Sequence, residues 1–195
     1  DAMNNPERDL GRIVLPPAAY EHEVEKIKVR MPAAIDFIRD QKLNEFFGPT
    51  GRDKTGKTGL IVVGGMYNST IRALQFLGLC DAYGNSKVPI YVMNVAYPTI
   101  KSEVDAFCEG LDAVLMIEEG QPEYIEQSIS TVLARTKSPT AVHGKDYLPM
   151  GGDYTAAVLT EGIGRFLEDH EPKQLGNRAP VPDPVPILRN PVIER

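Results

Sequence analysis

The chain has 195 residues, of which 42% are hydrophobic and 25% charged, and its formal net charge is −6 at pH 7. A core of this size buries roughly 70% of the unfolded chain's surface, so an ordinary globular protein is expected. The negative charge and the lack of a basic run argue against nucleic acid and anionic membranes as partners. No apolar run approaches the length of about 20 residues that crosses a bilayer, and the N-terminus shows no signal-peptide pattern.

Cys80 and Cys108 are the only cysteines in the sequence. They form no C-x-x-C pair, and two thiols cannot supply a four-cysteine metal or iron–sulfur site. We expect both to be reduced core residues, as is usual in a cytoplasmic protein.

Residues 1–57 are predicted to form an N-terminal preamble. The turn-forming LPPAAY leads into a helical stretch from Tyr20 to Phe47, which Pro32 interrupts. The preamble ends in a polar segment that is rich in glycine.

That segment, GRDKTGKT at residues 51–58, fits the G-x-x-x-x-G-K-[ST] pattern of a phosphate-binding loop. A working loop of this kind follows a strand and opens a helix, so that its amides meet the phosphate. Here a helix precedes Gly51, and the strand GLIVV follows Thr58 directly. Lys57 would therefore enter a strand, and we interpret the segment as a connector rather than as part of an NTPase.

Residues 58–170 repeat one unit, a short apolar strand followed by an amphipathic helix. Asn68 is expected to cap the first of these helices, and Pro122 to lie in the first turn of the third. Apolar strands that alternate with such helices predict an α/β fold whose mostly parallel sheet is covered on both faces. The predicted strands are GLIVVGG, PIYVMNV, DAVLMIEEG and PTAVHG, and the predicted helices are NSTIRALQFLG, TIKSEVDAFCEG, PEYIEQSISTVLA and DYTAAVLTEGIGRFLEDH.

Ligands of such sheets bind at the carboxyl ends of the strands, so the candidate site residues are those that follow the strands. In GGMYNST, two glycines and a helix start would present free backbone amides, but a plain strand–helix turn needs the same glycines, and both interpretations stay open. The candidate strand-end or domain-interface residues are Gly64, Gly65, Tyr67, Asn68, Tyr97, Pro98, Glu118, Glu119, His143, Lys145 and Asp146.

The acidic and histidine candidates have structural as well as chemical interpretations. Glu118 and Glu119 are a carboxylate pair that suits acid–base work or a metal, but acids also stabilise a helix N-terminus, and we favour a domain contact. His143 is able to transfer protons, but we favour a hydrogen-bonded structural role; His22 and His170 are expected to be solvated. We therefore predict no catalytic residue and no metal site.

From Glu171 onward the sequence is rich in proline and has no periodicity. This composition predicts that residues 171–195 form an extended linker to a further domain.

Segments of the body, taken in chain order, carry a family resemblance. GLIVVGGMYNSTIRALQFLG, YPTIKSEV, VLMIEEGQPEYIEQ and HGKDYLPMGGDYT resemble the indolepyruvate:ferredoxin oxidoreductases. These thiamine-diphosphate enzymes decarboxylate aryl 2-oxoacids oxidatively to acyl-CoA and reduce ferredoxin. The resemblance covers about residues 58–170.

The resemblance implies that residues 58–170 are the transketolase C-terminal-like domain, a three-layer αβα sandwich of about five strands with one antiparallel edge strand. Residues 11–17, GRIVLPP, are expected to supply that strand. For the parent enzyme it implies thiamine diphosphate, magnesium and iron–sulfur clusters as cofactors. It also implies ferredoxin and CoA as partners, and a homodimer.

The family's thiamine pyrophosphate motif, Gly-Asp-Gly followed by Asn, is missing from the sequence, and GGDY at Gly151 does not match it. The family's cysteine runs are missing as well. We therefore expect a structural or interaction domain that binds no cofactor and is inactive alone, with other domains or subunits of the same oxidoreductase as partners. The alternative is a freestanding flavodoxin-like nucleotide- or cofactor-binding domain that uses Gly64, Gly65 and Asn68.

Overall fold

The computed structural model describes residues 15–49, 51 and 56–176. The chain divides into two compact units, Asp1–Leu43 and Asn44–Arg195, which are described separately. In the part that is described, no helix combines the length and the apolarity needed to cross a bilayer.

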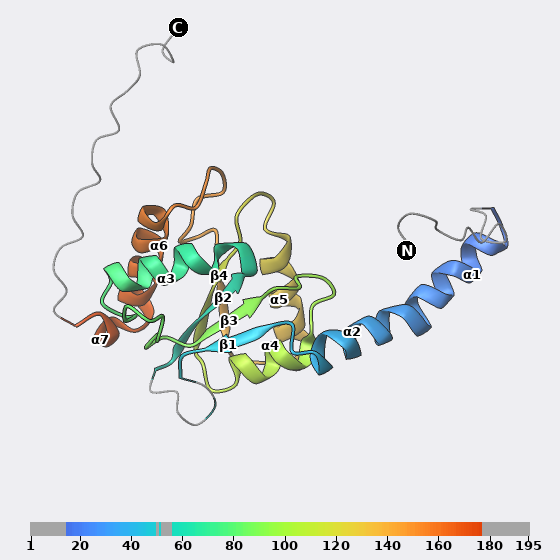
Figure 1. Cartoon of the computed structure of the whole chain (residues 1–195), viewed down its shortest axis with the longest axis horizontal. Coiled ribbons are helices and arrows are strands. Elements are labelled where there is room, and N and C mark those ends of the chain that lie inside the picture. Colours follow the sequence, from blue (N-terminus) through green and yellow to red (C-terminus); the bar gives the residue numbers. More distant parts are fainter. Residues whose placement is uncertain (1–14, 50, 52–55, 177–195) are drawn as a thin grey trace, which may run out of the picture. The chain divides into compact units, whose positions relative to one another are not determined.

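The first unit is a helix with one irregular turn. α1 (Ala18–Glu25), the π-helical η1 (Lys26–Arg30) and α2 (Met31–Asp40) follow one another without a break, as Figure 1 shows. The N–H of Met31 bonds to the carbonyl of Lys26, five residues earlier. Because Pro32 has no N–H to donate, the α-helical hydrogen-bond pattern cannot continue unchanged through it. The wide turn just before Pro32 accommodates the proline. The expected interruption is this turn, and the helix ends at Asp40 instead of continuing to Phe47.

The second unit contains a five-stranded sheet. In spatial order its strands are β1 (Glu45–Phe47), β3 (Ile90–Met93), β2 (Thr58–Val63), β4 (Ala113–Ile117) and β5 (Ala141–His143). β2 pairs in parallel with β3 and β4, and β4 with β5, whereas β1 is antiparallel to β3. The prediction of an α/β fold with a mostly parallel sheet and one antiparallel edge strand is confirmed.

The source of the antiparallel strand was predicted wrongly. β1 lies just before the connector, whereas residues 15–17 form a turn and residues 11–14 lie outside the described part. Phe46 stacks on Tyr91 with ring centroids 4.9 Å apart, and Phe47 packs against Tyr67. Three residues are too few to show the alternation of apolar and polar residues that marks a strand. The sequence analysis therefore includes them in the preceding helix, Tyr20 to Phe47.

Helices cover both faces of the sheet. α3 (Tyr67–Phe76) and α6 (Ala156–His170) lie on one face, and α4 (Lys101–Cys108) and α5 (Tyr124–Thr136) on the other (Figure 1). Because side chains alternate along a strand, Leu60 and Val62 of β2 pack with α3 and α6, whereas Ile61 packs with α4 and α5. Strand β4 alternates in the same way, so two apolar cores share one sheet.

Three details of the helices differ from prediction. A 3₁₀ turn, η3 (Gly64–Met66), precedes α3, so Met66 rather than Asn68 is the N-cap. Pro122 lies outside α5, which begins at Tyr124. The predicted linker begins as a short helix, α7 (Pro172–Leu175), whose Leu175 joins the core beside α3 and α6. Residues 177–195 of that linker lie outside the described part.

Candidate functional site

The topology identifies one edge of the sheet as the place for a site. The segment after β2 leads to α3 on one face, and the segment after β4 leads to α5 on the other. Neighbouring strands whose connections diverge in this way form a topological switch point, where α/β sheets bind ligands. Here η3 and residues 118–120 flank it.

Glu118 directly follows β4 and caps the start of α5. The side chain is 8% exposed, and its carboxylate accepts hydrogen bonds from the N–H groups of Ile125 (3.1 and 3.0 Å) and Glu126 (3.1 Å). These are N–H groups that the first turn of a helix leaves without an intrahelical partner. The Glu118 carboxylate, for which a domain contact is favoured over acid–base work or metal binding, is thus engaged with the start of α5, where its charge also suits the helix dipole.

Lys145 connects the segments that follow β4 and β5. Its ammonium group donates to the backbone carbonyl of Glu118 and to the Tyr154 hydroxyl, 2.6 Å away, and its backbone N–H donates to Glu126 (3.1 Å). The Tyr154 N–H donates to Glu119 Oε1 at 2.6 Å. We call these five residues the Lys145 cross-link. It brings together three predicted residues, Glu118, Glu119 and Lys145.

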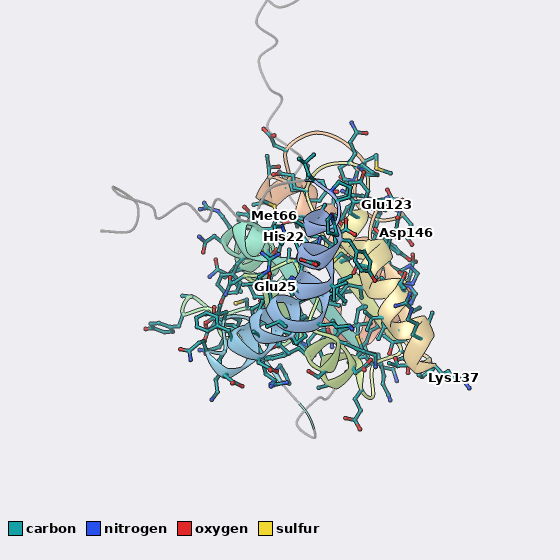
Figure 2. All side chains as sticks on the ribbon, turned by 90° about the vertical axis from the view of Figure 1, so that its right-hand side faces the viewer. His22, Glu25, Met66, Glu123, Lys137 and Asp146 are labelled. Carbon is teal, nitrogen blue, oxygen red and sulfur yellow. The ribbon has the colours of Figure 1, made fainter. Side chains whose placement is uncertain are left out.

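Gly144 lets the cross-link close. A Cβ atom at this position would lie 2.0 Å from Glu126 Oε2, so a larger residue would displace that carboxylate. Burial, together with the charges of Asp146, Glu123 and Glu118, raises the pKa of Glu126, although the Lys145 N–H opposes the shift. Figure 2 shows Glu123 and Asp146 toward one end of α5 and Lys137 at its other end.

A second cluster surrounds His143. Its Nδ1 lies 2.6 Å from Asp146 Oδ2, and its ring centroid lies 4.5 Å from that of His170. The Tyr147 hydroxyl lies 3.2 Å from His170 Nε2 and donates to Asp169 at 2.9 Å. We call these five residues the histidine cluster. His143 has the predicted hydrogen bond, and His170 is exposed, as predicted, although its ring also packs against that of His143.

The surroundings of the histidine cluster shift three pKa values. Partial desolvation of its ring by the surrounding side chains lowers the pKa of His170, and the neighbouring His143 lowers it further. Burial and the hydrogen bond to Asp169 raise the pKa of Tyr147 to about 12. Burial alone would raise the pKa of Asp146, but the hydrogen bonds from His143 and Gly144 outweigh it and keep that pKa low.

The lowered pKa of His170 predicts that acid weakens the domain. A histidine whose pKa is lower in the folded state stabilises the fold above its unfolded pKa of about 6.5, and this stabilisation is lost as pH falls. We expect the melting temperature to fall between about pH 7.5 and pH 5, and His170→Asn to make that fall shallower. Thermal unfolding followed by circular dichroism checks this. His22→Asn, on α1, is the control, and an unchanged slope in His170→Asn would contradict the expectation.

The remaining candidates lie at the same edge. Gly64 lies against Asn94, since a Cβ at Gly64 would be 2.6 Å from the Asn94 side-chain oxygen. Tyr67 faces inward, with its ring 4.9 Å from that of Phe47. Gly65, Asn68 and Tyr97 are exposed, and Pro98 is half-buried. The geometry around Gly64 is that of a close strand–helix turn, which does not favour the nucleotide-binding alternative.

The last two residues of the phosphate-loop pattern, Lys57 and Thr58, make a structural contact at the amino end of β2. One carboxylate oxygen of Glu171 accepts from the N–H groups of Lys57 (2.9 Å) and Thr58 (3.0 Å) and from the Thr58 hydroxyl (2.7 Å). These amides bind a carboxylate of the chain itself. Glu171 therefore fastens the end of α6 to the start of β2.

The donors at the carboxyl edge do not suit a magnesium–diphosphate group. The Glu118 carboxylate binds backbone N–H groups, as do single oxygens of Glu119 and Glu126. Among the described residues, no group of three or more His, Cys, Asp or Glu side chains has a geometry that would hold a metal ion. Cys80 is half-buried and Cys108 is buried, and the two form no disulfide.

Sequence reasoning missed several members of these clusters. Tyr147 lies one loop turn from predicted residues, and Tyr154 belongs to the GGDY segment, which the sequence analysis compares only with a cofactor motif. His170 and Glu171 come from the far end of α6. In the sequence, only their position at the end of this long helix indicates that they could reach the ends of the strands.

The chain is similar in sequence to a segment of larger proteins. No protein-family model matches the chain. The chain is 29% identical to the indolepyruvate oxidoreductase subunit IorA of Thermococcus kodakarensis. The aligned 133 residues make up 68% of this chain and 20% of that protein. It is 28% identical to IorA of Methanothermobacter thermautotrophicus. There the aligned 158 residues make up 80% of this chain and 24% of that protein. The chain is similar to one segment of these IorA proteins.

The resemblance to indolepyruvate oxidoreductases predicted from the sequence is thereby confirmed, and the chain spans about a fifth to a quarter of the length of these IorA proteins. Two solved structures are more distantly similar, both at 18% identity. A split-gene transketolase described as an inactive beta4 tetramer has a TM-score of 0.43, covering 59% of this chain and 40% of that one. A 2-oxoglutarate:ferredoxin oxidoreductase from Magnetococcus marinus has a TM-score of 0.48, covering 76% and 23%.

Proposed function

We propose that this chain is a structural and interaction domain of an indolepyruvate oxidoreductase and that other domains or subunits carry out the chemistry. One observation carries the proposal: the chain aligns with IorA over most of its own length but over only 20–24% of IorA. The parent reaction would be the oxidative decarboxylation of aryl 2-oxoacids to acyl-CoA with reduction of ferredoxin.

The contacts at the carboxyl edge support a scaffold. The Lys145 ammonium and the Glu118 carboxylate, the groups best suited to act on a ligand, hold the strand-end segments to one another. Side chains fixed in this way give a rigid surface on which a neighbouring domain can be positioned. Tyr97, 77% exposed, and Tyr124, 69% exposed, add aromatic area of the kind that interfaces favour. We assign the predicted strand-end residues to that contact.

The parent enzyme would supply the cofactors of the family. Thiamine diphosphate accepts the electrons of decarboxylation, magnesium holds its diphosphate, and iron–sulfur clusters pass the electrons on. We place all three outside this chain, with ferredoxin and CoA as partners of the whole enzyme, a homodimer as its assembly and the cytoplasm as its compartment.

An activity assay tests the proposal. The purified 195-residue chain, supplied with thiamine diphosphate, magnesium, indolepyruvate, CoA and methyl viologen, is expected to reduce no viologen. The source protein captured from its cells with an antibody against this domain is expected to reduce it, as a single longer polypeptide or as an assembly of subunits. Turnover by the chain alone, or a captured protein without iron or activity, would overturn the proposal.

A further inference from the structure

The amino end of β2 holds a carboxylate in a cradle of hydrogen-bond donors. Glu171 Oε2 lies 2.9 Å from the Lys57 nitrogen, 3.0 Å from the Thr58 nitrogen and 2.7 Å from the Thr58 hydroxyl. Thr58 is fully buried, so its two donors are shielded from competing water. Gly56 leaves space for the carboxylate, since a Cβ there would lie 2.7 Å from Glu171 Oε1. The cradle is therefore built around an oxyanion.

Glu171 also begins the last segment of the chain that the structure describes. α7 follows it directly (Figure 1), and Leu175 of α7 packs into the core beside α3 and α6. We call residues 171–176 the strap. Its docking has a cost, because Gln174 Oε1 is buried without a hydrogen-bond partner among the described residues. Two side chains, Glu171 and Leu175, thus fasten the strap to the rest of the domain.

We propose that the donors of Lys57 and Thr58 form an oxyanion-binding site, which accepts the carboxylate or phosphate group of a small molecule when the strap detaches. Glu171 fills this site from within the chain, so docking of the strap and binding of a free anion exclude each other. The site rests on these contacts and not on the proposed function.

The donor set determines which ligands suit the site. Backbone N–H groups and a hydroxyl bond to carboxylate and phosphate oxygens alike, and a charged acceptor strengthens such bonds. The Lys57 ammonium bonds to the Gly110 carbonyl, 3.3 Å away, so the residue that supplies one N–H group also carries a positive charge. A free anion binds only where the strap yields, because a carboxylate of the same chain has a high effective concentration.

Amide NMR of the isotope-labelled 195-residue chain tests the site. Glu171→Ala removes the atoms of an acetate ion. Acetate is therefore expected to shift the Lys57 and Thr58 amide signals of this variant saturably, with a dissociation constant of roughly 1–50 mM. Sodium chloride at the same ionic strength should not do so. Glu161→Ala, an exposed position on the same helix, keeps Glu171 and is the matched control. Like the native chain, it should show no acetate response at these two signals.

A second ligand and a second variant sharpen the test. Inorganic phosphate is expected to shift the same two signals in Glu171→Ala, whereas a response to acetate alone would support the site and restrict its ligands to carboxylates. Glu171→Gln keeps the size of the side chain and one acceptor oxygen, so it is expected to fold and to bind acetate at least about threefold more weakly than Glu171→Ala. No saturable shift of Lys57 and Thr58 in either variant, or the same shift in the native chain, would overturn the proposal.

Cleavage by trypsin after Lys173, an exposed residue of α7, tests the exclusion. Proteases cut segments that have opened, so release of the strap speeds this cut, which mass spectrometry identifies. Acetate is expected to speed it at least about threefold in Glu171→Gln and to leave it unchanged in the native chain. Leu175→Ala, which loosens the strap but keeps Glu171, should be cut faster with or without acetate. A rate in Glu171→Gln that acetate does not change would refute the exclusion.

Discussion

Replacing Glu118 with alanine is expected to lower the free energy of unfolding by about 2–3 kcal/mol. The buried carboxylate is the acceptor for the N–H groups of Ile125 and Glu126, and no cap side chain of the helix itself replaces it. Without it, two N–H groups at the start of α5 lose a charged acceptor, and burial hinders water from taking its place. Urea unfolding followed by circular dichroism measures the loss.

Glu123 offers the matched control. It stands at the same end of α5, but its carboxylate bonds to the Gln127 side chain near the surface. Glu123→Ala is expected to change the stability by less than about 0.5 kcal/mol. Glu118→Gln, which keeps one acceptor oxygen but no charge, should fall between the two alanine variants. Equal losses in Glu118→Ala and Glu123→Ala would show that Glu118 is not the cap.

Replacing Asn44 with alanine is expected to destabilise the domain by about 2–4 kcal/mol. The Asn44 amide is buried and donates to Glu103 Oε2 (2.8 Å) and to the Tyr91 hydroxyl (3.2 Å). Its oxygen accepts from the Val95 N–H at 2.9 Å. Truncation therefore removes one hydrogen bond from each of three groups and leaves the Val95 N–H without this acceptor, although Tyr91 and Glu103 still bond to each other. The loss should be concentrated at β1, which Asn44 immediately precedes, and native-state hydrogen exchange at Phe47 reports it.

Two further variants define the network around Asn44. Tyr91→Phe removes only a hydroxyl that donates to Glu103 at 2.8 Å, and should cost about 1–2 kcal/mol. Gln75→Ala removes an exposed hydrogen bond from the Gln75 side-chain amide to the Asp81 carbonyl. Its free energy of unfolding should stay within about 0.5 kcal/mol of that of the native chain. A loss in Asn44→Ala no larger than that in Gln75→Ala would contradict the role assigned to Asn44.

Most of the sheet could be predicted from the sequence because its central strands are buried on both faces. β2 and β4 read as unbroken apolar runs, and each is followed by a helix with an apolar stripe. Such runs do not depend on distant partners to be recognised. β1 is different: Glu45 and Phe46 are exposed, and the strand exists because β3 offers an open edge to pair with.

The candidate site could be predicted only in part. The rule that strand ends converge placed Glu118, Glu119 and Lys145 at one edge, and the structure joins them in the Lys145 cross-link. The same rule could not show that Glu118 points back at α5, or that Tyr154 completes the cross-link. Hydrogen bonds between residues 9 to 35 positions apart depend on loop conformations that carry no periodic pattern.

The sequence by itself determined the class of this protein, because apolar periodicity and helix-end residues act over a few neighbouring positions. It determined that an α/β sheet has helices on both faces, that the phosphate-loop letters stand at the wrong end of a strand, and that the body resembles an indolepyruvate oxidoreductase segment. Only the tertiary structure decided which strand closes the edge, where Glu171 is bound, and that His170 meets His143. Those contacts join segments far apart in the chain, and they form only once the packed sheet has brought the segments together.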